Sequence, residues 1–214
     1  MLNVVFLSEE QKLTQWRGEE SVRELLQEFK VRITAASGGF QISAQGHKHK
    51  IDAICFFQGA CLQLRIAIEL LFFAALAARS SDEAKRLGQQ WSHESKPSVI
   101  NNKLKNMDIK YWPEAIITRL QEGRIWQVKL APISISPEET IELYGKINNL
   151  LHAKRHYVVA DIAEDLSWVN NGLERLRDQT THFIIYSEDS AKYVVTMRWG
   201  EDNAPHLDPL KCRL

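Results

Sequence analysis

Residues 51–78, IDAICFFQGACLQLRIAIELLFFAALAA, form the most apolar stretch of the chain and decide its fold. Apolar side chains occur on most sides of a helix drawn through this stretch, which is typical of the central helix of a bundle. Asp52, Arg65 and Glu69 interrupt it, so no uninterrupted apolar run reaches the roughly 20 residues that a membrane-spanning helix needs. The stretch therefore predicts a buried core helix, which we place at 44–79, and a protein without a membrane partner.

Amphipathic and capping patterns predict further helices on both sides of this segment. Apolar side chains recur every three or four residues in 19–36, where Gly38-Gly39 supplies a stop, and again in 162–176, where Asp161 is the expected N-cap. Ser136-Pro137-Glu138-Glu139 combines a capping serine, a proline at the first helical position and a glutamate at N3, which predicts a helix running to about Lys154. Weaker patterns predict helices in 8–18, 83–90, 97–106 and 113–122.

After Asp178 the pattern changes to that of strands. The β-branched and aromatic runs 183–186 and 193–197 flank a polar connection, which is the signature of a β-hairpin. Residues 3–7 are a possible third strand, and 203–214 are expected to form an irregular tail. The predicted fold class is mainly α: a helical bundle domain in 1–178 with a small C-terminal β-hairpin and tail, 179–214, packed on the same domain.

The charge balance and the cysteine content of the chain limit its function and its location. The 214 residues carry 27 Lys+Arg against 27 Asp+Glu, so a broadly basic nucleic-acid-coating protein is excluded and any charge-based function must be local. The three cysteines are odd in number and indicate a reducing compartment without a disulfide framework, which predicts a cytoplasmic location. Cys55 and Cys61 are interpreted as core thiols. They fit no zinc-ligand spacing, and we expect no metal and no other cofactor.

The expected helix that begins at Ser136 carries a row of polar side chains in its segment 141–157, IELYGKINNLLHAKRHY. Tyr144, Asn148 and His152 are spaced at i, i+4 and i+8, so they share one helix face. An imidazole moves protons near neutral pH, and a neighbouring cation holds a phosphate. The same row is also typical of a polar packing seam, and cations in a last helical turn complement the helix dipole. The cations concerned are Lys154, Arg155 and His156.

The segment Lys146 to His152, KINNLLH, resembles the motif of the HEPN superfamily of helical prokaryotic domains. In that motif an arginine, often followed by a polar residue, precedes a histidine by four to six positions on a late helix. Here Lys146 stands in the place of the arginine, and Asn148 follows the cation by two places. Lysine keeps the charge of arginine but loses the planar fork that grips a phosphate twice. The resemblance covers about half of the chain, from the long apolar helix through Asp178.

Many HEPN members are metal-independent RNA-cleaving toxins or phage-defence effectors that act as dimers with their motif helices facing each other. The resemblance therefore implies an endoribonuclease or nucleotide-binding effector of stress, toxin–antitoxin or phage-defence systems that forms a homodimer. His152 would be the acid/base residue, with Lys146 and Asn148 as its catalytic companions. The phosphate-binding residues would be Lys154, Arg155 and His156, and Tyr144 would be an orienting group.

Two other functions remain open at this stage. The first is a non-catalytic interaction or dimerisation module whose C-terminal hairpin lends an edge strand to a protein partner. The second is a small-molecule sensor with a pocket inside the bundle.

Two charges inside the apolar stretch complete the candidate site. Arg65 and Glu69 are spaced at i and i+4, which predicts an intrahelical ion pair. An unpaired buried charge is costly, so a further partner is expected. If this helix packs against the motif helix, Glu69 can hydrogen-bond His152 and set its tautomer, and Arg65 and Glu69 then support the site.

Overall fold

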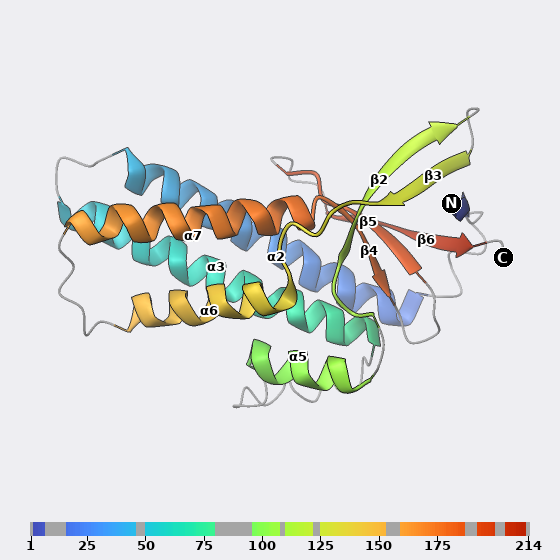
Figure 1. Cartoon of the computed structure of the whole chain (residues 1–214), viewed down its shortest axis with the longest axis horizontal. Coiled ribbons are helices and arrows are strands. Elements are labelled where there is room, and N and C mark those ends of the chain that lie inside the picture. The colour runs from blue at the N-terminus through green and yellow to red at the C-terminus, as the bar shows by residue number, and fades with distance from the viewer. Residues whose placement is uncertain are drawn as a thin grey trace.

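The structure is a computed structural model. It describes residues 2–6, 16–45, 50–79, 96–107, 110–121, 125–152, 159–186, 192–199 and 204–212. The chain is mainly α-helical, as the sequence predicts, and its helical half is joined to a smaller antiparallel sheet (Figure 1). The helices of this described part are α2 (Trp16–Ala44), α3 (Lys50–Arg79), α5 (Pro97–Asn106), α6 (Pro137–Leu151) and α7 (Val159–Gln179).

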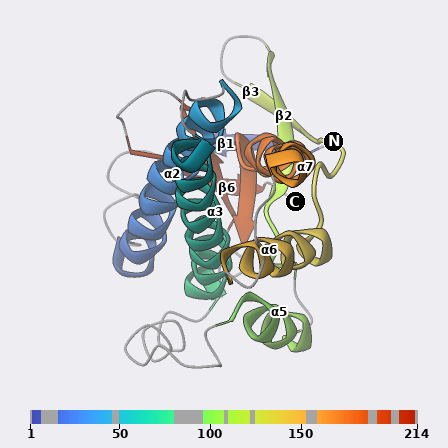
Figure 2. The same ribbon diagram turned by 90° about the vertical axis from the view of Figure 1, so that its left-hand side faces the viewer.

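Helix α3 lies at the centre of the molecule. It packs against α2, α5, α6, α7 and strand β4 (His182–Tyr186), and Figure 2 shows α2 on one side of it and α6 and α7 on the other. Its apolar composition follows from this position, because side chains on most of its faces are buried. By length and composition the segment Ile51–Arg79 also passes as a membrane-spanning helix, but 72% of its most apolar window is buried inside the protein. Such burial is typical of a core helix.

Helix α2 runs through the glycine pair that the sequence analysis interpreted as a stop. Gly39 faces α3, where a Cβ placed on it would lie 2.9 Å from the Cβ of Ala60. A larger side chain would separate the two helices, so this glycine serves close helix packing rather than chain termination. The predicted end at Ala36 is therefore wrong. Gly18, expected to close a separate short helix, also lies within α2, and residues 8–15 of that prediction lie outside the described residues.

The other helix predictions have mixed outcomes. Helix α5 coincides with the predicted 97–106. Helix α6 begins at the predicted proline but ends at Leu151, and helix α7 begins at Val159, so Asp161 lies inside it rather than at its N-cap. Helix α3 begins at Lys50 rather than at Ala44. The predicted helix at 83–90 lies outside the described residues.

The described strands form one closed antiparallel sheet in the order β1-β3-β2-β4-β5-β6. Strands β4 and β5 pair from His182↔Thr196 to Tyr186↔Lys192, and β1 closes the sheet by pairing with both β3 and β6. The sheet therefore combines strands from 1–178 with strands from 179–214. The bounds are β1 Leu2–Phe6, β2 Glu114–Gln121, β3 Ile125–Leu130, β5 Lys192–Thr196 and β6 His206–Cys212.

Two predictions for these segments are wrong. Residues 114–121 form strand β2 instead of a helix, because the β-branched run Ile116-Ile117-Thr118 finds a partner in β3, with pairs from Ile116↔Leu130 to Gln121↔Ile125. The supposed irregular tail contains β6, which pairs with β5 from Lys192↔Leu210 to Thr196↔His206. Pro209 is accommodated in this strand. Each of the two strands is held between two others, β2 between β3 and β4 and β6 between β5 and β1, and this pairing outweighs the local sequence pattern.

Candidate functional site

The start of helix α6 is fixed by its capping box, as predicted. The backbone N–H of Glu139 donates to Ser136 Oγ (3.1 Å), and the backbone N–H of Ser136 donates to Glu139 Oε2 (2.8 Å). The hydrogen bond from the Ser136 N–H and the ion pair with Arg175 lower the pKa of Glu139 to about 2. The capping box and the ion pair therefore fix the N-terminal end of α6. The polar row of Tyr144, Asn148 and His152 follows further along the helix.

The buried carboxylate of Glu69 joins α3 to α6. Its side chain is 8% exposed, and Oε1 accepts hydrogen bonds from Tyr144 Oη at 2.8 Å and from Arg65 Nε at 3.2 Å. The guanidinium of Arg65 also lies over the Tyr144 ring, 5.6 Å from its centroid. We call Arg65, Glu69 and Tyr144 the Glu69 cluster. Burial, together with the hydrogen bond to Glu69, raises the pKa of Tyr144, so its phenol stays a donor.

The predicted ion pair between Arg65 and Glu69 is thus present, but the further partner of Glu69 is Tyr144 rather than His152. Tyr144 precedes His152 by eight residues on the same helix face, a separation of roughly 12 Å along the axis. The hypothesis that Glu69 sets the tautomer of His152 is therefore wrong. Glu69 instead holds the phenol of Tyr144, which is the residue of the polar row farthest from His152.

His152 is the C-cap of α6 and its side chain is exposed. Its backbone N–H donates to the carbonyl oxygen of Asn148 at 3.1 Å, and Asn148 itself is half-buried. The polar row of α6 thus runs from the Glu69 cluster at Tyr144, past Asn148, to an imidazole open to solvent. The predicted phosphate-binding residues Lys154, Arg155 and His156 lie outside the described residues.

Lys146 makes its contacts with α7. Its Nζ lies 4.0 Å from the centroid of the Trp168 ring and 3.9 Å from Asp165 Oδ1, and the Asp165 side chain is 14% exposed. An ammonium over an indole face beside a carboxylate is held by a cation–π contact and an ion pair together. Lys146 therefore packs between α6 and α7, a role that differs from the catalytic one expected from the sequence. The sequence feature that could have indicated this contact is the spacing of Asp165 and Trp168, an acidic and an aromatic residue three positions apart on the following helix.

Cys61 on α3 is buried, as predicted for a core thiol, and burial together with the nearby charge of Asp165 raises its pKa to about 12. Cys55 is exposed, so its interpretation as a core thiol is wrong. Burial therefore favours the neutral thiol of Cys61 over the thiolate, which is the reactive form.

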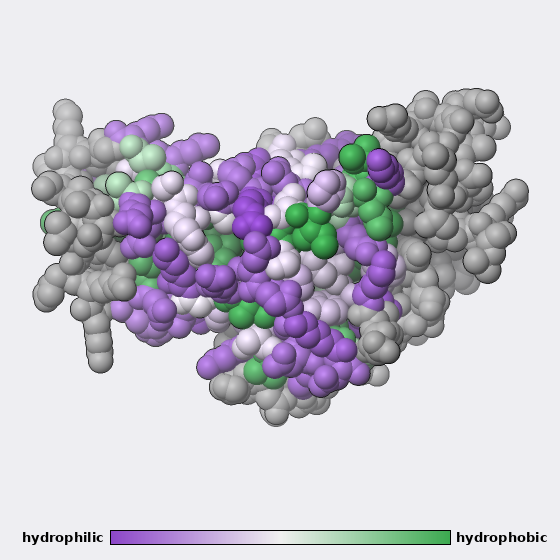
Figure 3. Space-filling model, in the orientation of Figure 1, coloured by the Kyte–Doolittle hydropathy of each residue, from purple (hydrophilic) through white to green (hydrophobic). Residues whose placement is uncertain are grey.

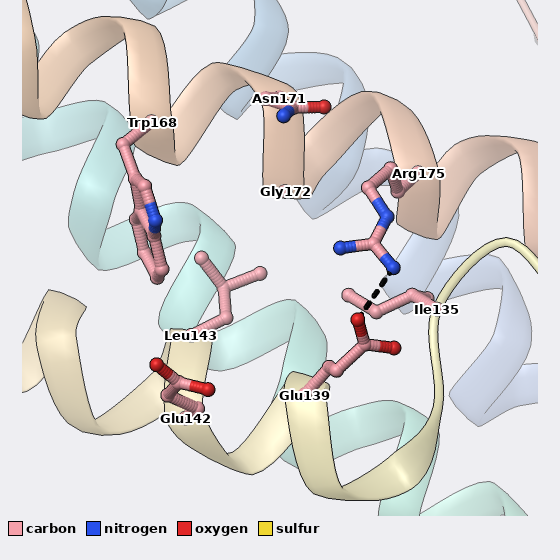
Figure 4. Close-up of a pocket in the computed structure, with 8 residues that line it drawn as sticks. All are labelled: Ile135, Glu139, Glu142, Leu143, Trp168, Asn171, Gly172 and Arg175. Carbon is pink, nitrogen blue, oxygen red and sulfur yellow. Dashed lines mark hydrogen bonds and ion pairs between the residues drawn. The ribbon is translucent and has the colours of Figure 1, made fainter.

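A small pocket of about 150 Å³ lies between α6 and α7 (Figure 4). Arg175 reaches across it to Glu139 at 2.7 Å and donates through Nε to the carbonyl oxygen of Ser134 at 2.6 Å. Gly172 allows α7 to approach Leu143 of α6 closely, because a Cβ placed on Gly172 would lie 2.8 Å from Leu143 Cδ1. The guanidinium in this pocket is already bound to groups of the protein, which indicates a structural rather than a ligand-binding role.

Among the described residues, no group of three or more His, Cys, Asp or Glu side chains is placed to hold a metal ion. Comparison of the chain with protein-family models, with curated proteins and with solved structures finds no match. The polar row of α6 is therefore the candidate functional site of the described residues.

Proposed function

We propose that the chain is a HEPN-like, metal-independent effector that cleaves RNA or binds a nucleotide through the polar row of α6. The observation that carries this proposal is the exposure of the His152 imidazole at the end of a row that is anchored, two helical turns away, by the buried Glu69 cluster. An acid/base group must be accessible to its substrate and must sit on a fixed support, and this helix provides both.

The proposed reaction is a transesterification within the RNA strand. The 2′-hydroxyl oxygen attacks the adjacent phosphorus, and the bond from phosphorus to the 5′ oxygen breaks. The imidazole of His152 accepts the 2′-hydroxyl proton and returns a proton to the departing 5′ oxygen. The products are a 2′,3′-cyclic phosphate and a free 5′-hydroxyl, and the nucleophile comes from the RNA itself.

The sharpest test is cleavage of a fluorescently labelled single-stranded RNA in the presence of EDTA. We expect the wild-type chain to produce 2′,3′-cyclic phosphate ends and His152→Ala to lose about 10²–10⁴-fold in rate. Asn149→Ala is the matched control, because Asn149 is an exposed residue of α6 next to the polar row. Cleavage that persists unchanged in His152→Ala would contradict the proposal.

A second candidate function is a non-catalytic interaction or dimerisation module. It is favoured by the position of Lys146, whose ammonium lies against Trp168 and Asp165, whereas the HEPN resemblance implies that this cation is a catalytic companion of His152. For this function we expect His152→Ala to change the oligomeric state, measured by light scattering, while no RNA cleavage is found for the wild-type chain.

A further inference from the structure

A larger pocket, of about 480 Å³, lies beside the N-terminus of α6, where Pro137 is one of its lining residues. We call it the β2–β3 pocket. It is formed where the connection from α5 to β2 runs beside the connection from β3 to α6, and Figure 3 shows hydrophobic surface in the region where the helical half meets these strands. Its apolar lining includes Tyr111, Trp112, Pro113, Leu130, Pro132 and Ile133.

The walls of the β2–β3 pocket are held by contacts outside it. The indole N–H of Trp112 donates to the carbonyl oxygen of Ile135 at 3.0 Å, and the hydroxyl of Tyr111 donates to the side-chain oxygen of Asn101. Both aromatic residues are 8% exposed. Proline residues on both connections restrict the backbone further. The pocket is therefore preformed, and a ligand would not have to order it.

The pocket is electrically neutral within the described residues. Its charged lining residues are Lys110 and Glu114, whose Nζ and Oε1 atoms are 2.9 Å apart. Glu114 also accepts a hydrogen bond from the hydroxyl of Tyr186. A charged ligand would have to be desolvated against a pair that is already compensated, which disfavours both anions and cations.

The hydrogen-bonding groups of the walls lead to the same conclusion. The Trp112 and Tyr111 donors are used within the protein, so apart from the Lys110–Glu114 pair the side chains offer a ligand aromatic, proline and aliphatic surface. At its mouth, Leu130 and Ile133 are 52% and 67% exposed. An apolar ligand would cover both side chains, and removal of this surface from water would drive binding.

We propose that the β2–β3 pocket binds a small, uncharged and mainly apolar molecule. Its volume lies in the range of roughly 300–1,000 Å³ found for pockets that bind drug-sized ligands. The site is separate from the polar row of α6, so it stands whether or not the chain cleaves RNA.

The test uses two fluorescent probes that share their aromatic rings and differ in charge. N-phenyl-1-naphthylamine is neutral, and 1-anilinonaphthalene-8-sulfonate carries a sulfonate. We expect the full chain to bind one equivalent of the neutral probe saturably, with a blue-shifted emission, and to bind the sulfonate at least tenfold more weakly.

Two isoleucine variants locate the binding. Ile133→Glu places a carboxylate at the mouth of the pocket and should weaken binding of the neutral probe at least tenfold. Ile117→Glu is the matched control, because Ile117 is 49% exposed on β2 but does not line the pocket. Both positions are exposed, so both variants should fold, and the far-UV circular dichroism of each should equal that of the wild type.

Three results would overturn the proposal. The first is the absence of saturable binding of the neutral probe by the wild-type chain. The second is equal affinity of the two glutamate variants for this probe. The third is a dimer of the wild-type chain that Ile133→Glu converts to a monomer, since a second copy would then cover the surface.

Discussion

Gly38 and Gly39 are adjacent in α2, yet alanine substitutions at the two positions should change stability in opposite directions. An ideal Cβ on Gly38 meets nothing within 4 Å, whereas a Cβ on Gly39 lies 2.9 Å from Ala60 Cβ and 3.4 Å from the carbonyl oxygen of Phe56. The first position faces open space, and the second faces the backbone of α3. The two variants therefore separate the effect of helix propensity, at Gly38, from the effect of helix packing, at Gly39.

The magnitudes follow from these distances. Gly38→Ala should stabilise the protein by about 0.8–1 kcal/mol, because alanine is favoured over glycine by that amount in a helix interior. Gly39→Ala gains the same propensity, but it forces α2 and α3 apart by about half an ångström in a close-packed interface. Overpacking of this kind typically costs about 1–3 kcal/mol, and here the contact is with a Cβ and a backbone atom that cannot rotate away. The overpacking cost less this propensity gain leaves an expected net loss of up to about 2 kcal/mol.

Thermal unfolding followed by circular dichroism gives the comparison directly. In a chain of this size about 1 kcal/mol shifts Tm by roughly 2–4 °C, so Gly38→Ala should raise Tm by about that much and Gly39→Ala should lower it. If both variants raise Tm, the prediction that Gly39 is needed for the close packing of α2 against α3 is wrong. If both lower it, the helix does not continue through the glycine pair.

Three further predictions concern single side chains. Tyr144→Phe removes one of the two donors to the buried carboxylate of Glu69, so urea unfolding should show a loss of about 1.5 kcal/mol, whereas an unchanged midpoint would contradict the contact. The pKa of Glu139 is lowered to about 2 by the capping box and its ion pair, so its contribution is present above the ordinary glutamate pKa and is lost as pH falls toward 2. Glu139→Gln should therefore flatten the decline of Tm between pH 5 and 2, and a parallel decline would refute this assignment. Iodoacetamide at pH 8, read by peptide mass spectrometry, should label the exposed Cys55 and leave Cys61, whose pKa is about 12, unlabelled until the protein unfolds.

The parts of the fold that were predicted correctly are those encoded locally. Ser136 and Glu139 form a capping box within four residues, so the start of α6 is visible in the sequence. Pro113 begins the predicted helix 113–122 but instead precedes strand β2, because proline can stand before a helix or a strand, and the pairing of β2 with β3 decided between them. Gly39 is a similar case, because its role in close packing depends on Ala60 of another helix and its own sequence neighbours do not show it.

The residues of the candidate site also divide into features that the local sequence predicts and contacts that depend on helix packing. Spacing alone places Tyr144, Asn148 and His152 on one face of α6, and the charge pattern of α3 predicts the pair of Arg65 and Glu69. Which residue of the row meets Glu69 depends on the axial position of α3 relative to α6, which is a property of the packed core. The contacts of Lys146 with α7 likewise exist only once the two helices are packed, and local patterning could not reveal them.

The proposed function requires that the imidazole of His152 contact RNA, and NMR of the histidine ring protons can detect this contact. The probe is a single-stranded RNA with 2′-O-methyl groups, which cannot be cleaved, and the His152 signals are identified by their absence in His152→Ala. We expect these signals to shift saturably as the RNA is added and the amide signal of Asn149 to shift less. Ring signals of His152 that stay unchanged while the RNA binds elsewhere, or while it does not bind at all, would contradict the claim.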